Sequence, residues 1–316
     1  MRKQDKILLV STFSSMVLGV CMPFLAEPLA WFPRVSMLTM LFISFLAIDG
    51  KEALLHVLHS PFVVFLLLLL SLVVMPFVCW GVFYFVLPEY ALGAALIGGT
   101  SAAVMAPFFA FMVQADVILV IVGMVSTSLL MPLTLPLLLA FIGNLAQVGG
   151  GIQIDLSVGS MITNLSVMMV IPFVAAQIVR RVWHSVTVVV FKVRQVIFLL
   201  TTCVTMVAIF AQYSSIILQS PESVLWAILS TVLVELLIFL FSAAVTFWLP
   251  PATQLAIVIC CLVINSVIVL ILAVDFFGAP EALVAAMFSA GVFAALPLLR
   301  ILCKLRGYNP TESNVR

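Results

Sequence analysis

The sequence predicts an all-α polytopic membrane protein with ten transmembrane helices. Three observations predict this fold class: the composition, the spacing of apolar segments and the placement of charges. Of the 316 residues, 65% are hydrophobic and 8% are charged, and the mean hydropathy is +1.38. Soluble domains carry about 25% charged residues. This chain therefore has too few charges to cover a water-facing surface, and we expect lipid to solvate most of it.

Apolar segments separated by charged or turn-forming residues divide the chain into ten predicted spans. Most of them reach the roughly 20 apolar residues that cross the hydrocarbon core of a bilayer. The predicted spans are 7–26, 35–48, 61–87, 91–113, 117–142, 158–179, 195–218, 223–249, 255–274 and 281–303. The second span is short, and its length alone also fits a re-entrant segment.

The placement of Lys and Arg favours ten crossings. With ten crossings, twelve of the thirteen Lys and Arg residues fall on one side of the membrane, and Arg34 falls on the other. If segment 35–48 does not cross, the split becomes three against ten. The positive-inside rule therefore predicts a protein of the inner (plasma) membrane with both termini in the cytoplasm. A net charge of +1 argues against a nucleic-acid partner.

A short internal repeat indicates two related halves. Residues 16–26 (MVLGVCMPFLA) resemble residues 165–175 (LSVMMVIPFVA). Since an internal segment cannot be a cleaved signal peptide, the first copy is predicted to be a retained helix as well. Five spans in each half would invert the second copy, which is a recurrent build of secondary transporters. The predicted domains are a first five-helix repeat (1–150), a second, inverted repeat (151–306) and a cytoplasmic tail (307–316).

The fourth span contains signals for an interrupted helix. Gly98 and Gly99 precede Thr100 and Ser101, and Pro107 lacks a backbone donor. A helix broken at membrane depth exposes backbone groups, which is tolerated where they line a cavity. We therefore predict that Thr100, Ser101 and Pro107 bind substrate. The alternative is a Gly-mediated helix contact with an ordinary Pro kink.

The fifth and ninth spans carry isolated polar groups. In the ninth span, Asn265 and Ser266 interrupt an apolar run. We predict both as substrate-binding residues, with hydrogen bonding between helices as the alternative. The fifth span carries Ser126-Thr127-Ser128, whose hydroxyls either face the bundle interior or bond to carbonyls of their own helix.

Glu235 lies at the centre of the span 223–249. A carboxylate at mid-membrane is expensive and marks a candidate functional site. Because burial favours the neutral form of a carboxylic acid, we predict Glu235 as a proton-coupling residue. The alternative is a neutral Glu235 with a structural hydrogen bond to a neighbouring helix.

Catalytic and metal-binding patterns are absent from the sequence. It contains no phosphate-binding Gly-rich loop with a lysine, no H-E-x-x-H and no G-x-S-x-G. Its six cysteines lie in apolar runs without disulfide or zinc spacing, and its three histidines fall in predicted loops. We therefore predict no enzyme activity, no cofactor and no metal site.

Several motifs resemble the bile acid:sodium symporter family in its ten-helix bacterial form. The segments ALGAALIGG, MVSTSLLMP and LTLP between residues 91 and 136 match the family's fourth and fifth helices. The resemblance implies two inverted five-helix repeats. It also implies a panel of spans one, two, six and seven facing a core, in which broken fourth and ninth helices cross.

The residues that couple sodium in that family do not carry over to this chain. Where the family has oxygen-bearing ligands in its fourth and ninth helices, this chain has Ala106, Pro107, Cys260 and Ile264, and retains Asn265. The remaining coupling positions correspond to Val120, Met124 and Ser71. Sodium prefers oxygen ligands, so the sequence predicts a divergent member without family-type sodium coupling.

Two functions are consistent with these features. The first is a secondary transporter of a small organic solute that works by alternating access; the resemblance implies an amphipathic organic anion. Its partners would be this solute and the lipid bilayer, and the oligomeric state is left open. The second is a non-transporting binding or sensory module that keeps the scaffold. An intramembrane enzyme acting on lipid is disfavoured because no acid, base or nucleophile has a catalytic partner.

Overall fold

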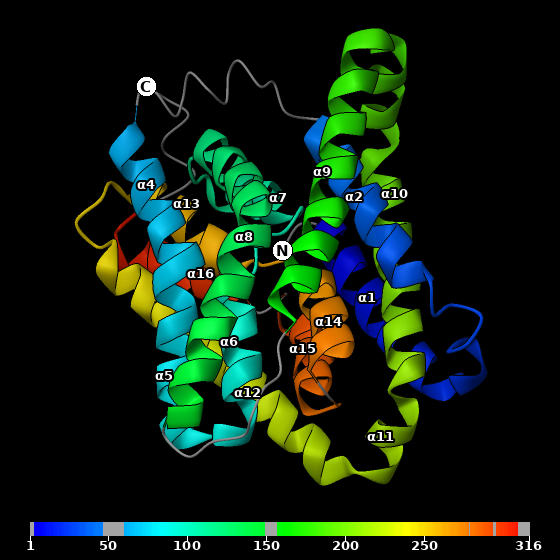
Figure 1. Ribbon diagram of the computed structural model, residues 1–316. Helices are drawn as coiled ribbons and strands as arrows, with labels where there is room; N and C mark the ends of the chain where they lie inside the picture. The colour runs from blue at the N-terminus through cyan, green and yellow to red at the C-terminus, as the bar shows by residue number, and fades with distance from the viewer. Residues whose placement is uncertain (1–2, 47–59, 149–156, 278, 293–294, 309–316) are drawn as a thin grey trace.

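The computed structural model describes residues 3–46, 60–148, 157–277, 279–292 and 295–308 (Figure 1). Over these residues the chain is helical, and none of them belongs to a β-strand. Helix occurs in each of the ten predicted spans. Four helical stretches in the described residues are long and apolar enough to cross a membrane alone, namely Pro61–Val86, Val117–Leu145, Val158–Val182 and Pro221–Val245. The structure therefore confirms an all-α, multi-pass membrane protein.

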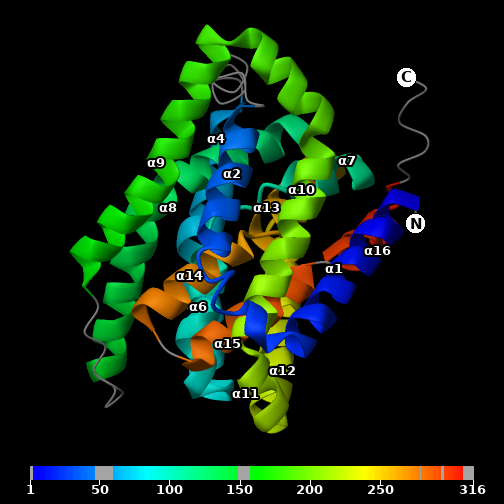
Figure 2. The same cartoon turned by 90° about the vertical axis from the view of Figure 1, so that its right-hand side faces the viewer.

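Four helices form one layer, which we call the panel (Figure 2). They are α1 (Lys3–Cys21), α2 (Phe32–Leu46), α9 (Val158–Val182) and α10 (His184–Gln212). Within the panel, α9 packs on α2, α2 packs on α10, and α10 packs on α1. The contact between α1 and α10 depends on Gly19, because a Cβ there would lie 2.6 Å from the Val207 carbonyl oxygen.

The other helices form a second group, which we call the core (Figure 1). Its first half comprises α4 (Pro61–Leu69), a π-helical turn (Leu70–Val74), α5 (Met75–Val86), α6 (Ala91–Gly99), α7 (Ala106–Val113) and α8 (Val117–Val148). Its second half comprises α12 (Pro221–Val245), α13 (Pro251–Leu262), α14 (Ser266–Phe276), α15 (Ala279–Gly291) and α16 (Ala295–Leu305). The short α11 (Ser214–Gln219) connects panel and core.

Three predicted spans differ from the helices observed. The predicted loop before residue 195 is wrong: α10 begins at His184, and Trp183 alone separates it from α9. Charged residues Lys192 and Arg194 suggested a loop, but charged side chains do not by themselves end a helix, and α10 includes both. The fifth span runs on to Val148, and the tenth is divided into α15 and α16.

Other predictions fall on residues outside those described. They concern most of the segment 45–61, including His56 and His59, and the linker before residue 157.

Candidate functional site at the crossing of two interrupted helices

The fourth span is interrupted where the sequence predicts it. Helix α6 ends at Gly99, Thr100 has an extended backbone, and α7 begins at Ala106. The two glycines allow close packing before the break. A Cβ at Gly99 would lie 2.7 Å from Leu135 Cδ1, and one at Gly98 would lie 3.0 Å from the Met75 carbonyl oxygen.

The ninth span is interrupted as well, and the two breaks meet. Helix α13 ends at Leu262 and α14 begins at Ser266. The Ala103 amide donates to the Val263 carbonyl at 2.7 Å, and the Asn265 amide donates to the Ser101 carbonyl at 3.0 Å. These two bonds form an antiparallel bridge between segments more than 150 residues apart. Each break thereby satisfies backbone groups that the other has left without helical partners.

Helix α8 supports the crossing from one side. The Thr127 hydroxyl accepts a hydrogen bond from the Ala102 amide at 3.2 Å and donates to the Met124 carbonyl at 3.1 Å. The Met131 sulfur accepts from the Ser101 amide at 3.2 Å. Within the hydroxyl cluster of the fifth span, Thr127 thus meets both predicted alternatives, because it bonds to a carbonyl of its own helix and to the break.

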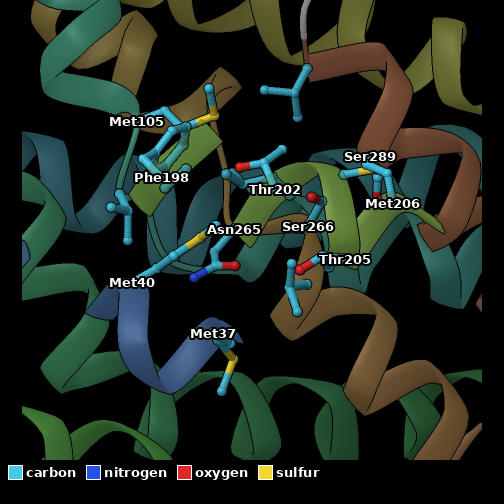
Figure 3. Close-up of a pocket in the computed structure, with 15 residues that line it drawn as sticks. Met37, Met40, Met105, Phe198, Thr202, Thr205, Met206, Asn265, Ser266 and Ser289 are labelled. Atoms are coloured by element: carbon cyan, nitrogen blue, oxygen red, sulfur yellow. The ribbon is translucent and has the colours of Figure 1, made fainter. Parts of the chain in front are cut away.

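A pocket of about 60 Å³ lies between the panel and the crossing (Figure 3). Two panel helices, both breaks and α15 provide its lining. The fifteen lining residues are Met37, Met40, Ala103, Val104, Met105, Phe198, Thr202, Thr205, Met206, Ile264, Asn265, Ser266, Val267, Ser289 and Val292. None of these fifteen residues is charged. Figure 3 shows Met40, Met105 and Phe198 on one side and Thr202, Ser266 and Ser289 on the other, with Asn265 between them.

Two of the six predicted site residues line this pocket. Asn265 and Ser266 lie at the start of α14, where the Asn265 side chain accepts a hydrogen bond from the Ile268 amide at 3.4 Å. Thr100 and Ser101 are buried in the crossing and do not line the pocket. The Thr100 hydroxyl donates to the Leu96 carbonyl at 2.6 Å. Pro107 lies in the first turn of α7 and is not part of the lining either.

The sixth predicted residue, Glu235, also lies away from the pocket. It is buried on α12, where its carboxylate contacts the end of α15 at Gly291. Oε1 has no hydrogen-bond partner in the part of the chain that the structure describes. Burial without a bond is the observation that still favours a functional role for this side chain.

The start of α14 and the segment before α7 both border the pocket. Val104 and Met105 precede the first turn of α7, and Ser266 and Val267 form the first turn of α14. The N-terminal end of a helix carries about half a positive charge and unpaired amide donors. Negatively charged groups are therefore favoured here although no basic side chain lines the pocket.

Sequence reasoning missed the lining that the panel contributes. Met37 and Met40 are three residues apart on α2, and Phe198, Thr202 and Thr205 follow helical spacing on α10. This spacing places each set on one helix face. The threonines in the mainly apolar second half of α10 were the available signal, but only the tertiary structure shows that they are buried and that this face meets the crossing.

The residues that the resemblance aligns with the family's ion ligands pack against apolar atoms and sulfur. The Cys260 thiol lies 3.9 Å from the Val120 carbonyl oxygen. A Cβ at Gly123 would lie 2.8 Å from Cys260 Sγ and 2.9 Å from Leu67 Cδ1. The Ser71 hydroxyl donates to the Leu67 carbonyl of its own helix at 2.9 Å.

An all-helical multi-pass protein in which two broken helices cross beside a pocket has the features of a membrane transporter. Comparison with family models gives the family: residues 34–220 match the sodium bile acid symporter family, and the chain belongs to it. This confirms the resemblance found in the sequence. A search of curated proteins returns no significant match.

Proposed function

We propose that the protein is a secondary transporter that moves a small organic solute by alternating access between the panel and the core. The observation that carries this proposal is the pocket at the crossing of the two broken helices, bounded on its other side by α2 and α10. Discontinuous helices at the boundary of two helix groups are the usual location of a transporter's substrate site.

The packing supports ten crossings in two inverted repeats. The panel helices of the two halves pair symmetrically. Helix α1, the first of the first half, contacts α10, the second of the second half, and α2 contacts α9. The two hydrogen bonds of the crossing are reciprocal in the same way. With ten crossings, both termini lie in the cytoplasm, and reporter fusions at each end test that orientation.

The pocket supports an amphipathic organic anion as the solute. Methionine and phenylalanine side chains supply adaptable apolar contacts, five hydroxyl or amide side chains supply neutral hydrogen bonds, and the helix ends favour negative charge. The volume of about 60 Å³ is well below the roughly 300 Å³ at which pockets for drug-sized ligands begin. Binding such a solute therefore requires that the panel move away from the core.

Counterflow of a radiolabelled bile acid in proteoliposomes tests this proposal. We expect saturable counterflow that Asn265→Ala reduces, because the variant removes a pocket amide and the cap of α14. Asn164→Ala, which removes an exposed amide of α9, is the matched control and should leave counterflow unchanged. Absence of counterflow for every member of a set of amphipathic organic anions would contradict the proposal.

The second candidate is a binding or sensory module that does not transport. The small pocket and the filled positions around Cys260 favour it. It predicts saturable binding of a labelled anion to the purified protein without any counterflow. The pair of measurements therefore separates the two functions.

A further inference from the structure

Glu235 lies deep within the protein, far from both ends of its helix. It is fourteen residues from Pro221 and ten from Val245, which corresponds to about 21 Å and about 15 Å along α12. Its side chain is 4% exposed. Water at either membrane face therefore has no direct access to the carboxylate.

The carboxylate packs directly on the backbone of α15. A Cβ added at Gly291 would overlap Glu235 Oε1, so the glycine is required for this contact. One turn earlier on α12, the Thr231 hydroxyl is already engaged, since it lies 2.9 Å from the Ala227 carbonyl and 3.5 Å from the Val284 carbonyl. Within the described residues, Oε1 has no hydrogen-bond partner.

Helix α15 connects this contact to the solute pocket. Gly291 is the last residue of α15, and the next helix, α16, begins at Ala295. Ser289 and Val292, on either side of Gly291 in the sequence, line the pocket. Glu235 and the pocket therefore contact the same short segment at the end of α15.

Among the described residues, no ionisable group around α12 forms an ion pair with Glu235. The elements in contact with α12 are α5, α6, α11, α13, α15 and α16. Their ionisable side chains in the described chain are Cys79, Tyr84, Cys260, Cys261, Glu281, Arg300, Cys303 and Lys304, and α12 itself adds Glu222. Glu281 is about 15 Å from Gly291 along α15. The ion pairs that the structure shows in the described residues do not include Glu235.

We propose that Glu235 is a proton-binding site whose occupancy sets how tightly α12 packs on the end of α15 and so controls access to the pocket. A carboxyl oxygen takes one proton from the aqueous phase on one side, which gives a neutral acid that packs against Gly291. Release of that proton leaves a carboxylate that must gain water, and α15 moves away from α12. A proton released to the opposite side has crossed the membrane, and the link to solute movement rests on the proposed function.

The pH dependence of pocket access tests the proton site without any knowledge of the solute. A cysteine introduced by Ser289→Cys is labelled in proteoliposomes with a maleimide, and labelling of the unsubstituted protein is subtracted. A cysteine introduced by Ser160→Cys on the exposed start of α9 reports the pH dependence of the thiol reaction itself. We expect the ratio of the two rates to change by about 5-fold or more with pH, which is the lower end of typical coupling between two sites.

Variants identify the group responsible. Glu235→Gln keeps the size of the side chain and cannot titrate, so it should make the ratio independent of pH. Glu222→Gln, at the exposed start of the same helix, is the matched control and should leave the pH dependence intact. A ratio that does not change with pH in the parent protein, or that still changes in Glu235→Gln, would overturn the proposal.

A second measurement covers the case in which Glu235→Gln does not fold. Infrared spectra of the parent protein in liposomes should show the carbonyl band of a protonated, buried carboxylic acid that disappears as the pH rises. If no such band titrates, the proposal is wrong. A titrating site without counterflow would contradict the transport function alone, whereas counterflow with pH-independent access would contradict the proton site alone.

Discussion

An ion pair connects the panel to the core at one face of the molecule. Nη2 of Arg34 donates to both carboxylate oxygens of Asp275, at 2.6 Å and 2.8 Å. Arg34 lies in the first turn of α2 and Asp275 in the last turn of α14. With the proposed orientation, Arg34 faces the outside, so this pair has to break when the pocket opens in that direction.

The exposure of the two side chains limits the strength of this pair. Arg34 is 56% and Asp275 is 26% exposed, so the screened range for surface pairs, about 0.2 to 1 kcal/mol, applies rather than that of a buried pair. Because 1.4 kcal/mol corresponds to a factor of ten, removal of the pair should increase the population open on this face by up to about fivefold. Higher salt should reduce the effect.

Labelling of Met40→Cys with a membrane-impermeant maleimide measures this opening. Met40 lines the pocket and lies about 9 Å from Arg34 along α2. Arg34→Ala and Asp275→Ala should each raise the labelling rate, and the double variant should raise it no further. Exchange of the two charges should restore the original rate, and Arg300→Ala is a control for loss of a positive charge elsewhere. Additive effects of the single variants, or no effect of either, would refute the reasoning.

Three further predictions follow from the packing. Gly19→Ala should destabilise the protein by about 1–3 kcal/mol, because the new Cβ would lie 2.6 Å from a backbone oxygen of α10; Gly159→Ala, which has open space, should not lower the thermal midpoint in detergent. Replacement of sodium by potassium should change neither the thermal midpoint nor counterflow. Bound sodium at a concentration of ten times its dissociation constant would stabilise the protein by about 1.4 kcal/mol. We expect no such stabilisation, because sulfur and apolar carbon atoms crowd the space around Cys260 and Gly123. Saturable stabilisation by sodium alone would contradict this prediction. Asn265→Asp should keep the cap of α14 and the stability of the protein but weaken anion binding. Asn265→Ala should lower the free energy of unfolding by about 1 kcal/mol, because it removes the cap. Tighter anion binding by Asn265→Asp would argue against an anionic solute.

The interruptions of the fourth and ninth spans were predictable because their causes are local. Glycines, a proline at a helix start and an isolated asparagine change the backbone where they occur. The family resemblance added that the two breaks cross, and the bridge between Ala102 and Ile264 confirms it. The breaks themselves required no knowledge of how distant helices pack, whereas their crossing came from the family resemblance.

The pocket and the place of Glu235 depend on packing that one sequence does not specify. Hydropathy gives the depth of Glu235 in its span but not the direction in which its side chain points, and it faces Gly291 rather than the pocket. In the same way, Met37 and Thr205 look like ordinary residues of apolar helices until the panel is placed against the crossing. The depth of a residue in its span depends on that segment alone, whereas the helix that the residue faces depends on the whole fold.

The crossing explains how the fold can form without the side chains that the family uses as ion ligands. The bonds that join the two breaks run between backbone groups, from Ala103 to Val263 and from Asn265 to Ser101, and any residue with an amide hydrogen can form them. Side chains at these positions are therefore free to change as long as the glycines and helix starts that produce the breaks remain. Cys260 and Ile264, which the resemblance aligns with ligand positions of the family, occur here beside an intact crossing. On the proposed function, the energy for solute movement would come from a proton gradient that acts through Glu235, which is buried beside Gly291 at the end of α15.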